Sequence, residues 1–287
     1  MSVNPQAMTG MQLFDRVCQE CSVRTTHAYS TSFSMGIRFL SPSLREPIYA
    51  IYGFVRFADE IVDTFHEHDK RTLFDRFKED TDRALAEKIS LNPILHAFQQ
   101  TYHKYGIERE HVDLFLRSME WDLDRNNYDR QGFDDYIVGS AEVVGLMCLK
   151  VFVDGDNAMY ERLVPAARRL GAAFQKINFL RDMHADFVEM GRTYFPGFDL
   201  NRFDDETKSG IEAEIHEDFQ EAYKGILELP RHSRLGVYVA YIYYTRLFAK
   251  IQALPSERIL EERIRIPNAR KATLLMGSYL RHSLNLL

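Results

Sequence analysis

The chain of 287 residues can bury a sizeable core, because 45% of its residues are hydrophobic and it contains only 15 glycines and 9 prolines. Its net charge of −6, with no basic stripe long enough to follow a phosphate backbone, argues against nucleic acid as a partner. Three cysteines give no disulfide framework and the amino terminus lacks a signal pattern, so we expect a cytoplasmic protein.

Helical periodicity runs through almost the whole chain, and strand signals are scarce. Helix breakers fall at residues 41–43, 92–93, 105–106, 154–156, 196–197, 230 and 267. The pattern predicts an all-α bundle of about eight to ten helices around a central cavity. We expect residues 1–10 to be disordered and residues 11–287 to form a single domain. The two most apolar stretches, 138–153 and 235–251, are each interrupted by two charged residues, which favours core helices over membrane spans.

The first acidic helix face carries Asp59 and Asp63, which lie four residues apart, and Tyr52 and Arg56 extend the same face backwards. The preceding run, 48–55, is apolar and aromatic, which argues against an exposed helix. Two carboxylates about 4 Å apart oppose each other by roughly 4 kcal/mol at an effective dielectric near 20, so a cation is expected beside them. The alternative is a solvated face with an intrahelical Arg/Asp pair.

The second acidic face carries Gln175, Asn178, Asp182 and Asp186 in a helix whose other positions are largely apolar. Its polar groups therefore need partners. A polar network between helices would explain Gln175 and Asn178 but not two further carboxylates without cations. Two such faces looking across a bundle suit Mg²⁺, which binds one or two carboxylates together with substrate phosphates. The sequence thus predicts a magnesium-dependent enzyme that acts on diphosphates.

These segments belong to a larger set of motifs along the chain. The set comprises Ser30-Thr31-Ser32-Phe33, Arg56 with Asp59 and Asp63, Asp122 within residues 119–123, the run 175–186, and residues 191–196. With them the chain resembles, over nearly its whole length, the squalene and phytoene synthase family, which joins two prenyl diphosphates head to head. The resemblance implies a helical bundle of the isoprenoid synthase type, with residues 11–287 as its catalytic domain.

The resemblance also implies roles for individual residues. The implied Mg²⁺ ligands are Asp59, Asp63, Asn178, Asp182 and Asp186. The implied substrate contacts, several of them to diphosphate oxygens, are Ser30, Ser32, Phe33, Arg56, Gln175, Asn178, Arg181 and Lys271. The implied catalytic set is Tyr52, Arg56, Asp59, Asp63, Asp182 and Asp186. From the residues alone, Ser30 and Ser32 are also candidates for helix caps, and Lys271 for a solvated charged face.

One position departs from the family pattern. Members often carry a tyrosine where this chain has Val138, and valine can neither donate a hydrogen bond nor offer a π face to a carbocation. Tyr52, Tyr243 and Tyr244 are candidates to replace it, although the tyrosine-rich run 238–244 is more typical of plain core.

The expected product keeps a central double bond, because no GxGxxG or P-loop pattern indicates a bound dinucleotide that would supply hydride. By the resemblance, that product is phytoene from two geranylgeranyl diphosphates, as in carotenoid biosynthesis. The segment 119–128 favours phytoene, and so does Ile37, which lies one turn beyond Phe33 and leaves room for a long tail. The alternatives are a dehydrosqualene or squalene synthase that uses farnesyl diphosphate, and a non-enzymatic helical assembly protein of the same fold. The hydrophobic product favours peripheral association with a membrane.

Overall fold

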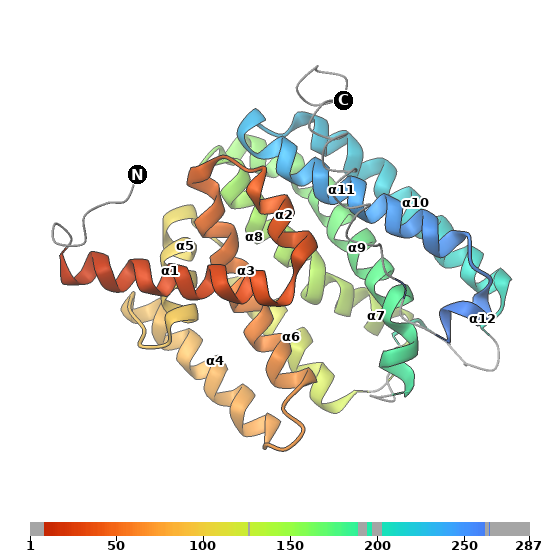
Figure 1. Ribbon diagram of the computed structural model, residues 1–287, viewed down its shortest axis with the longest axis horizontal. Helices are drawn as coiled ribbons and strands as arrows, with labels where there is room; N and C mark the ends of the chain where they lie inside the picture. The colour runs from red at the N-terminus through yellow and green to blue at the C-terminus, as the bar shows by residue number, and fades with distance from the viewer. Residues whose placement is uncertain (1–8, 126, 189–193, 197–202, 262–263, 265–287) are drawn as a thin grey trace.

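The computed structural model describes residues 9–125, 127–188, 194–196, 203–261 and 264. Every regular element in these ranges is helical, which confirms the prediction of an all-α protein (Figure 1). In chain order the helices are α1 (Gly10–Tyr29), α2 (Thr31–Arg38), α3 (Pro42–Asp63), α4 (Lys70–Glu87), α5 (Pro93–Tyr105), α6 (Arg109–Asp124), α7 (Arg130–Ile137), the π-helix η2 (Val138–Glu142), α8 (Val143–Phe152), α9 (Asn157–Val188), α10 (Asp205–Glu228), α11 (Arg231–Gln252) and α12 (Ser256–Ile259). The series is longer than the eight to ten helices expected, because α2 and α12 are short and a π-helix separates α7 from α8.

Several helix boundaries follow directly from the local sequence. Pro42 is the first residue of α3 and Pro93 the first of α5, where the missing N–H of proline has no helical acceptor to lose. The Asn92 side chain caps α5 by accepting a 3.0 Å hydrogen bond from the first turn. Gly106 ends α5 with φ of 61°, a left-handed conformation that favours glycine. The predicted break at Pro267 lies outside the described residues.

The start of α1 corrects the predicted disordered segment. The Thr9 side chain accepts the backbone N–H of Gln12 at 3.2 Å, and the Gln12 side chain accepts the backbone N–H of Thr9 at 3.0 Å. This reciprocal capping box begins the helix at Gly10, so the prediction of disorder is wrong for residues 9 and 10. Residues 1–8 lie outside the described part of the chain.

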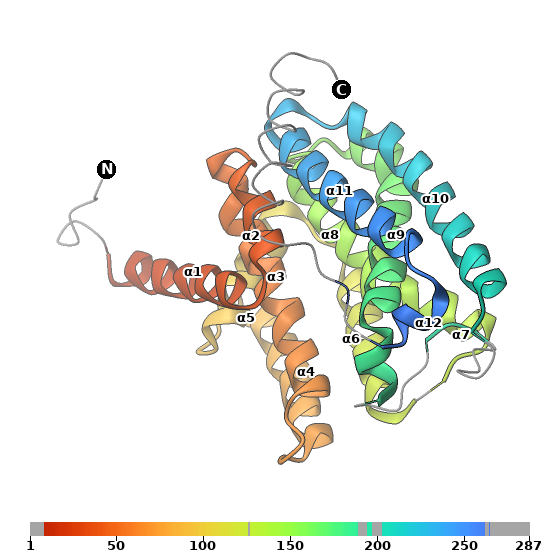
Figure 2. The same cartoon turned by 45° about the vertical axis from the view of Figure 1, so that its right-hand side comes forward.

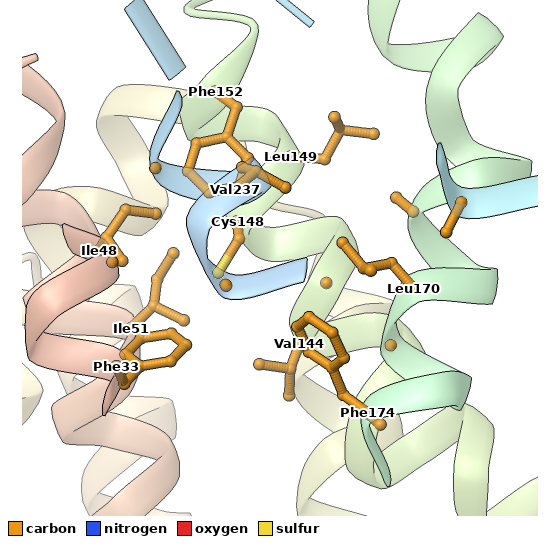
Figure 3. Close-up of a pocket in the computed structure, with 18 of the residues that line it drawn as sticks. Phe33, Ile48, Ile51, Val144, Cys148, Leu149, Phe152, Leu170, Phe174 and Val237 are labelled. Carbon is orange, nitrogen blue, oxygen red and sulfur yellow. The ribbon is translucent and has the colours of Figure 1, made fainter. Parts of the chain in front are cut away.

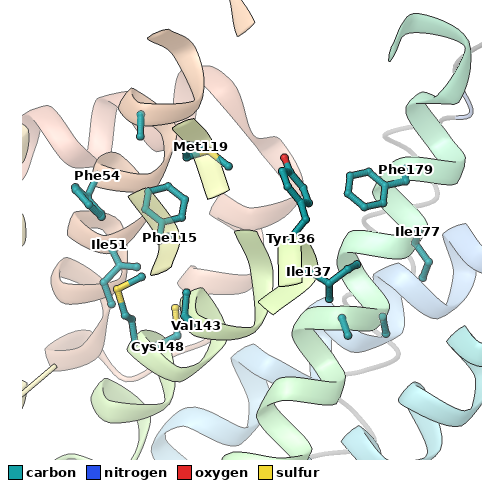
Figure 4. Close-up of a cluster of buried hydrophobic side chains, with 14 of the residues drawn as sticks. Ile51, Phe54, Phe115, Met119, Tyr136, Ile137, Val143, Cys148, Ile177 and Phe179 are labelled. Carbon is teal, nitrogen blue, oxygen red and sulfur yellow. The ribbon is translucent and has the colours of Figure 1, made fainter. Parts of the chain in front are cut away.

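Aromatic packing holds α3 against its neighbours. Phe54 on α3 stacks on Phe98 of α5 at 4.0 Å between ring centroids, and meets Phe115 of α6 at 5.4 Å. Ile51 and Met119 point into the same cluster (Figure 4). Helix α1 packs across α3 and α5 on this side of the molecule, whereas α9, α10 and α11 form the other side (Figure 2). The remaining face of α3 is thereby turned toward α9.

A buried charge network fastens α9 to α10. Asp218 on α10 is 1% exposed and accepts hydrogen bonds from Lys176 at 2.9 Å and Arg169 at 2.8 Å. Lys176 also donates to Glu214 at 3.0 Å. Because a buried carboxylate needs such partners, the network fixes which face of α9 turns away from α10. Within the described residues, no helix has the length and the hydrophobicity needed to cross a membrane.

Candidate active site

A cavity of about 320 Å³ lies between α3 and α9, and α2, η2, α8, α10 and α11 complete its walls. Its surface is almost entirely apolar. Phe33 and Ile51 face Phe174 and Leu170 across the space (Figure 3). Ile37 lines the same wall as Phe33, as the sequence predicted for a residue one helical turn away. The polar side chains that line the cavity next to the acidic helix faces are Tyr52, Gln175, Asn178 and Tyr244.

The first acidic face runs along the last turns of α3, from Tyr52 in the cavity wall to Asp63 at the end of the helix. The Arg56 guanidinium donates to Asp59 and to Glu60, and lies 4.3 Å from the ring centroid of Tyr29. The intrahelical Arg/Asp pair that the sequence offered as an alternative is therefore present. This pairing leaves one donor of the arginine unused, because the buried Arg56 Nε has no hydrogen-bond partner among the described residues.

Asp59 and Asp63 oppose each other electrostatically. Burial, together with the neighbouring charge of Asp63, raises the pKa of Asp59 to about 7, although Arg56 acts in the opposite direction. The Asp59 side chain is 34% exposed, and it lies one turn beyond Val55, the last residue of α3 that lines the cavity. We call this end of the cavity its mouth. A carboxylate that is crowded by protein atoms and by a second carboxylate, yet reached by solvent, is suited to binding a cation.

The second acidic face lies on α9. Gln175 and Asn178 line the cavity, and Asp182 follows Asn178 by one turn. Arg181 Nε donates to both carboxylate oxygens of Asp182, at 3.0 and 3.1 Å. The backbone of Asp186 belongs to α9, but its side chain lies outside the described residues, as does all of Lys271. The second face thus repeats the arrangement of the first, with an arginine paired to an acid at the mouth of the cavity.

Two aromatic pairs border the cavity beside these faces. The rings of Phe33 and Tyr52 lie 5.0 Å apart, and those of Phe174 and Tyr244 lie 3.9 Å apart and nearly parallel. The Tyr244 hydroxyl donates to Asn178 Oδ1 at 3.1 Å. The interpretation of residues 238–244 as plain core therefore fails for Tyr244, which lines the cavity, as does Tyr52.

The two serines predicted to contact substrate differ in position. The Ser30 side chain accepts the backbone N–H of Phe33 at 3.1 Å, so it caps α2, which was the alternative considered for it. Burial raises the pKa of Tyr52 to about 12, and a hydrogen bond from Ser30 acts against this rise, so Ser30 lies next to the cavity as well. Ser32 lies inside α2 and is half-buried.

The donors at the mouth of the cavity fit a hard divalent cation. They are carboxylate oxygens on α3 and α9 and the amide oxygen of Asn178, which are the ligand types that Mg²⁺ prefers. Within the described residues, no group of three or more His, Cys, Asp or Glu side chains could hold a metal ion by itself. Mg²⁺ commonly binds one or two carboxylates together with substrate phosphates and waters, and the two acidic faces fit that mode.

Val138 begins the π-helix η2 and does not line the cavity, whereas Ser140 and Ala141 of the same turn do. The wide turn packs closely on α9 at Gly171, where an added Cβ would lie 2.7 Å from the carbonyl oxygen of Ala141. Such π-turns are often found at functional sites. The hydrophobic pattern of the sequence does not reveal this turn, because one extra residue in a helical turn barely changes the period of that pattern.

A second polar cluster joins α6, α7 and the segment after α9, and no sequence pattern predicted it. Asp122 on α6 accepts hydrogen bonds from Tyr136 at 2.7 Å and from Tyr194 at 3.5 Å. Tyr194 in turn stacks on Phe179 of α9 at 4.1 Å. Asp122 belongs to a motif noted in the sequence, but only the structure shows that it links α6, α7 and the segment after α9.

Glu60 was also not predicted from the sequence as a partner of Arg56, although its position four residues after Arg56 is a readable signal.

Comparison with known proteins identifies similar chains. The family model described as Squalene/phytoene synthase matches residues 26–270. Phytoene synthase 1, chloroplastic, of Arabidopsis thaliana is 27% identical over 263 residues, which cover 84% of this chain and 60% of that protein. The 15-cis-phytoene synthase of Synechocystis sp. is 29% identical in an alignment 299 residues long, which covers 90% of this chain and 83% of that protein. The chain thus spans about 60% of the length of the plant relative.

A similar fold occurs among solved structures. A dehydrosqualene synthase in complex with ligand superposes with a TM-score of 0.77 at 19% identity, over 93% of this chain and 98% of that one. At this identity the likeness concerns the fold, which is the all-α isoprenoid synthase fold. This confirms the fold that the motifs implied.

Proposed function

The chain belongs to the squalene/phytoene synthase family, and from that premise we propose that it joins two prenyl diphosphates head to head in a Mg²⁺-dependent reaction. Members of the family are prenyltransferases and depend on a divalent metal. We assign two geranylgeranyl diphosphates as the substrates and phytoene as the product. The protein would act in the cytoplasm, in peripheral contact with the membrane that receives the insoluble product.

The observation that carries this proposal is the junction of two acidic helix faces with one apolar cavity. Tyr52 and Asn178 line the cavity, and Asp59 and Asp182 lie one or two turns further along α3 and α9. A prenyl diphosphate has the same division, with a charged head and a long apolar tail. The head would therefore sit between the two faces while the tail fills the cavity.

The chain's own residues would bind and orient the diphosphate. When bound, Mg²⁺ offsets the charge that develops on the leaving diphosphate. Asp59, Asp63, Asn178, Asp182 and Asp186 would hold it. Arg56 and Arg181 lie beside these acids, and the Nε of Arg56 leaves a donor for a diphosphate oxygen. Preorganised donors of this kind lower the barrier to breaking the carbon–oxygen bond.

The bond changes then proceed in two stages. The C1–O bond of one substrate breaks with its electrons leaving on diphosphate, the double bond of the second substrate attacks the allylic cation, and loss of a proton gives a cyclopropyl diphosphate. A second C–O cleavage, a rearrangement and a second proton loss leave a central double bond. The apolar and aromatic walls exclude water, which would otherwise capture the cations.

Phytoene is favoured over dehydrosqualene by the names of the relatives and by the small Ile37 in the cavity wall. Dehydrosqualene from two farnesyl diphosphates uses the same chemistry and is the second candidate. A purely structural role is disfavoured, because such a role would not need two acidic faces at the mouth of a cavity.

Product analysis tests the proposal. The purified protein is incubated with Mg²⁺ and either geranylgeranyl or farnesyl diphosphate, with and without NADPH, and the products are identified by mass spectrometry. We expect phytoene from geranylgeranyl diphosphate, unchanged by NADPH. Dehydrosqualene formed faster than phytoene would replace the chain-length assignment, and squalene formed only with NADPH would overturn the absence of a hydride step. No condensation of either substrate would favour the structural role.

A further inference from the structure

Tyr244 occupies a position that the proposed chemistry does not yet explain. It pairs with Phe174 on one cavity wall as Tyr52 pairs with Phe33 on the other. Tyr52 shares its helix with Asp59, so it lies on an acidic face by helical spacing alone. Tyr244 comes from α11, a helix that carries no residue of either acidic face. Its contact with α9 therefore results from tertiary packing, and the role of that contact needs a separate explanation.

The Tyr244 side chain is held at both ends. Its ring lies nearly parallel to Phe174 at 3.9 Å, and its hydroxyl donates to Asn178 Oδ1 at 3.1 Å. Phe174 and Asn178 are four residues apart on α9, so the ring and the hydroxyl of Tyr244 both contact the same face of that helix.

We propose that Tyr244 is a positioning residue that orients the Asn178 amide for cation binding. The inference rests on the proposed function, in which Asn178 is a metal ligand. An amide oxygen has two acceptor sites, so the hydroxyl can occupy one while the other remains for the cation. Without the hydroxyl, the amide can turn about its terminal torsion and lose that orientation. Partners of this kind, which hold a metal ligand without touching the metal, typically contribute about 10-fold to 100-fold to metal affinity.

Tyr244→Phe isolates the hydroxyl, because it keeps the ring and its stacking on Phe174. Tyr241→Phe is the matched control, since Tyr241 lies one turn earlier on α11 and packs on Phe219 at 5.3 Å, away from the cavity lining. The affinity for Mn²⁺ in the presence of inorganic diphosphate is measured by electron paramagnetic resonance. We expect Tyr244→Phe to weaken Mn²⁺ binding by about 10-fold to 100-fold and Tyr241→Phe to leave it unchanged.

Two further measurements distinguish positioning from a general structural effect. The Mg²⁺ concentration for half-maximal turnover should rise in Tyr244→Phe, while kcat at saturating Mg²⁺ recovers most of its value. In an Asn178→Ala background, the added Tyr244→Phe change should cost little, because the group it orients is gone.

Equal Mn²⁺ affinity in wild type and Tyr244→Phe would overturn the inference, and so would an equal loss with and without Asn178. If the wild-type protein binds Mn²⁺ and forms product, and Tyr244→Phe binds Mn²⁺ equally well, the result overturns the role of Tyr244 but not the proposed function. A wild-type protein that binds no Mn²⁺ with diphosphate overturns the metal-dependent function as well.

Discussion

Replacing Gly171 with alanine tests whether the close contact between α9 and the π-helix shapes the cavity. An added Cβ would lie 2.7 Å from the carbonyl oxygen of Ala141 and 3.1 Å from the Cα of Glu142. Both are backbone atoms, which cannot rotate away as a side chain can. Helix α9 must therefore move away from η2. Gly171 and Ala141 both line the cavity, and Gln175 follows one turn later, so the movement reaches the predicted substrate contacts.

Two opposing effects set how far Gly171→Ala changes the free energy of unfolding. Alanine gains up to about 1 kcal/mol over glycine inside a helix, whereas overpacking costs about 1 to 3 kcal/mol. Gly210 on α10 provides the control, because nothing lies within 4 Å of a Cβ added there. Gly210→Ala should raise the free energy of unfolding by about 0.4 to 1 kcal/mol. The helical gain is common to both variants, so Gly171→Ala should be less stable than Gly210→Ala by about 1 to 3 kcal/mol.

Urea unfolding followed by circular dichroism gives both free energies, and turnover with prenyl diphosphates reports the effect on the site. We expect Gly171→Ala to lose activity as well, since a displacement of about 1 Å can cost about 100-fold in rate. Gly210→Ala should keep its activity. If Gly171→Ala matched Gly210→Ala in both stability and turnover, the reasoning from the helix contact would be refuted.

Three further predictions concern the site. Asp59→Ala and Asp182→Ala should each remove most turnover while leaving the helical circular dichroism intact, whereas Asp75→Ala on the exposed face of α4 should not; full turnover in EDTA would contradict the metal role. Ile37→Phe should lower the ratio of rates with geranylgeranyl over farnesyl diphosphate, about tenfold for each 1.4 kcal/mol of differential strain, because Ile37 is 3% exposed and lines the cavity. An unchanged ratio in a folded variant would exclude Ile37 from chain-length selection. Magnesium affinity should rise with pH through about 7, since burial and Asp63 raise the pKa of Asp59 to about 7 and a cation binds only the deprotonated carboxylate. Calorimetry in buffers of different ionisation enthalpy should detect proton release on binding below about pH 7 that fades above it, and equal heats in all buffers would contradict the assignment.

The amino-acid sequence determined the parts of the site that lie within one helix. Asp59 and Asp63 share a face because they are four residues apart, and the same spacing places Asn178 and Asp182 together. The pairing of Arg56 with Asp59 likewise follows from a separation of three residues. Helix geometry alone is enough for these statements, since the hydrophobic period and the breakers already defined the helices.

The tertiary structure alone decided which helix faces meet. Tyr244 and Asn178 are 66 residues apart, and no local pattern joins them. Asp218 is charged and looks like a surface residue in its sequence, yet Lys176 and Arg169 satisfy it inside the α9–α10 contact. Local spacing sets the side chains that share a face. Which two faces meet depends on how all the helices bury their apolar surfaces together, and no short window of sequence contains that information.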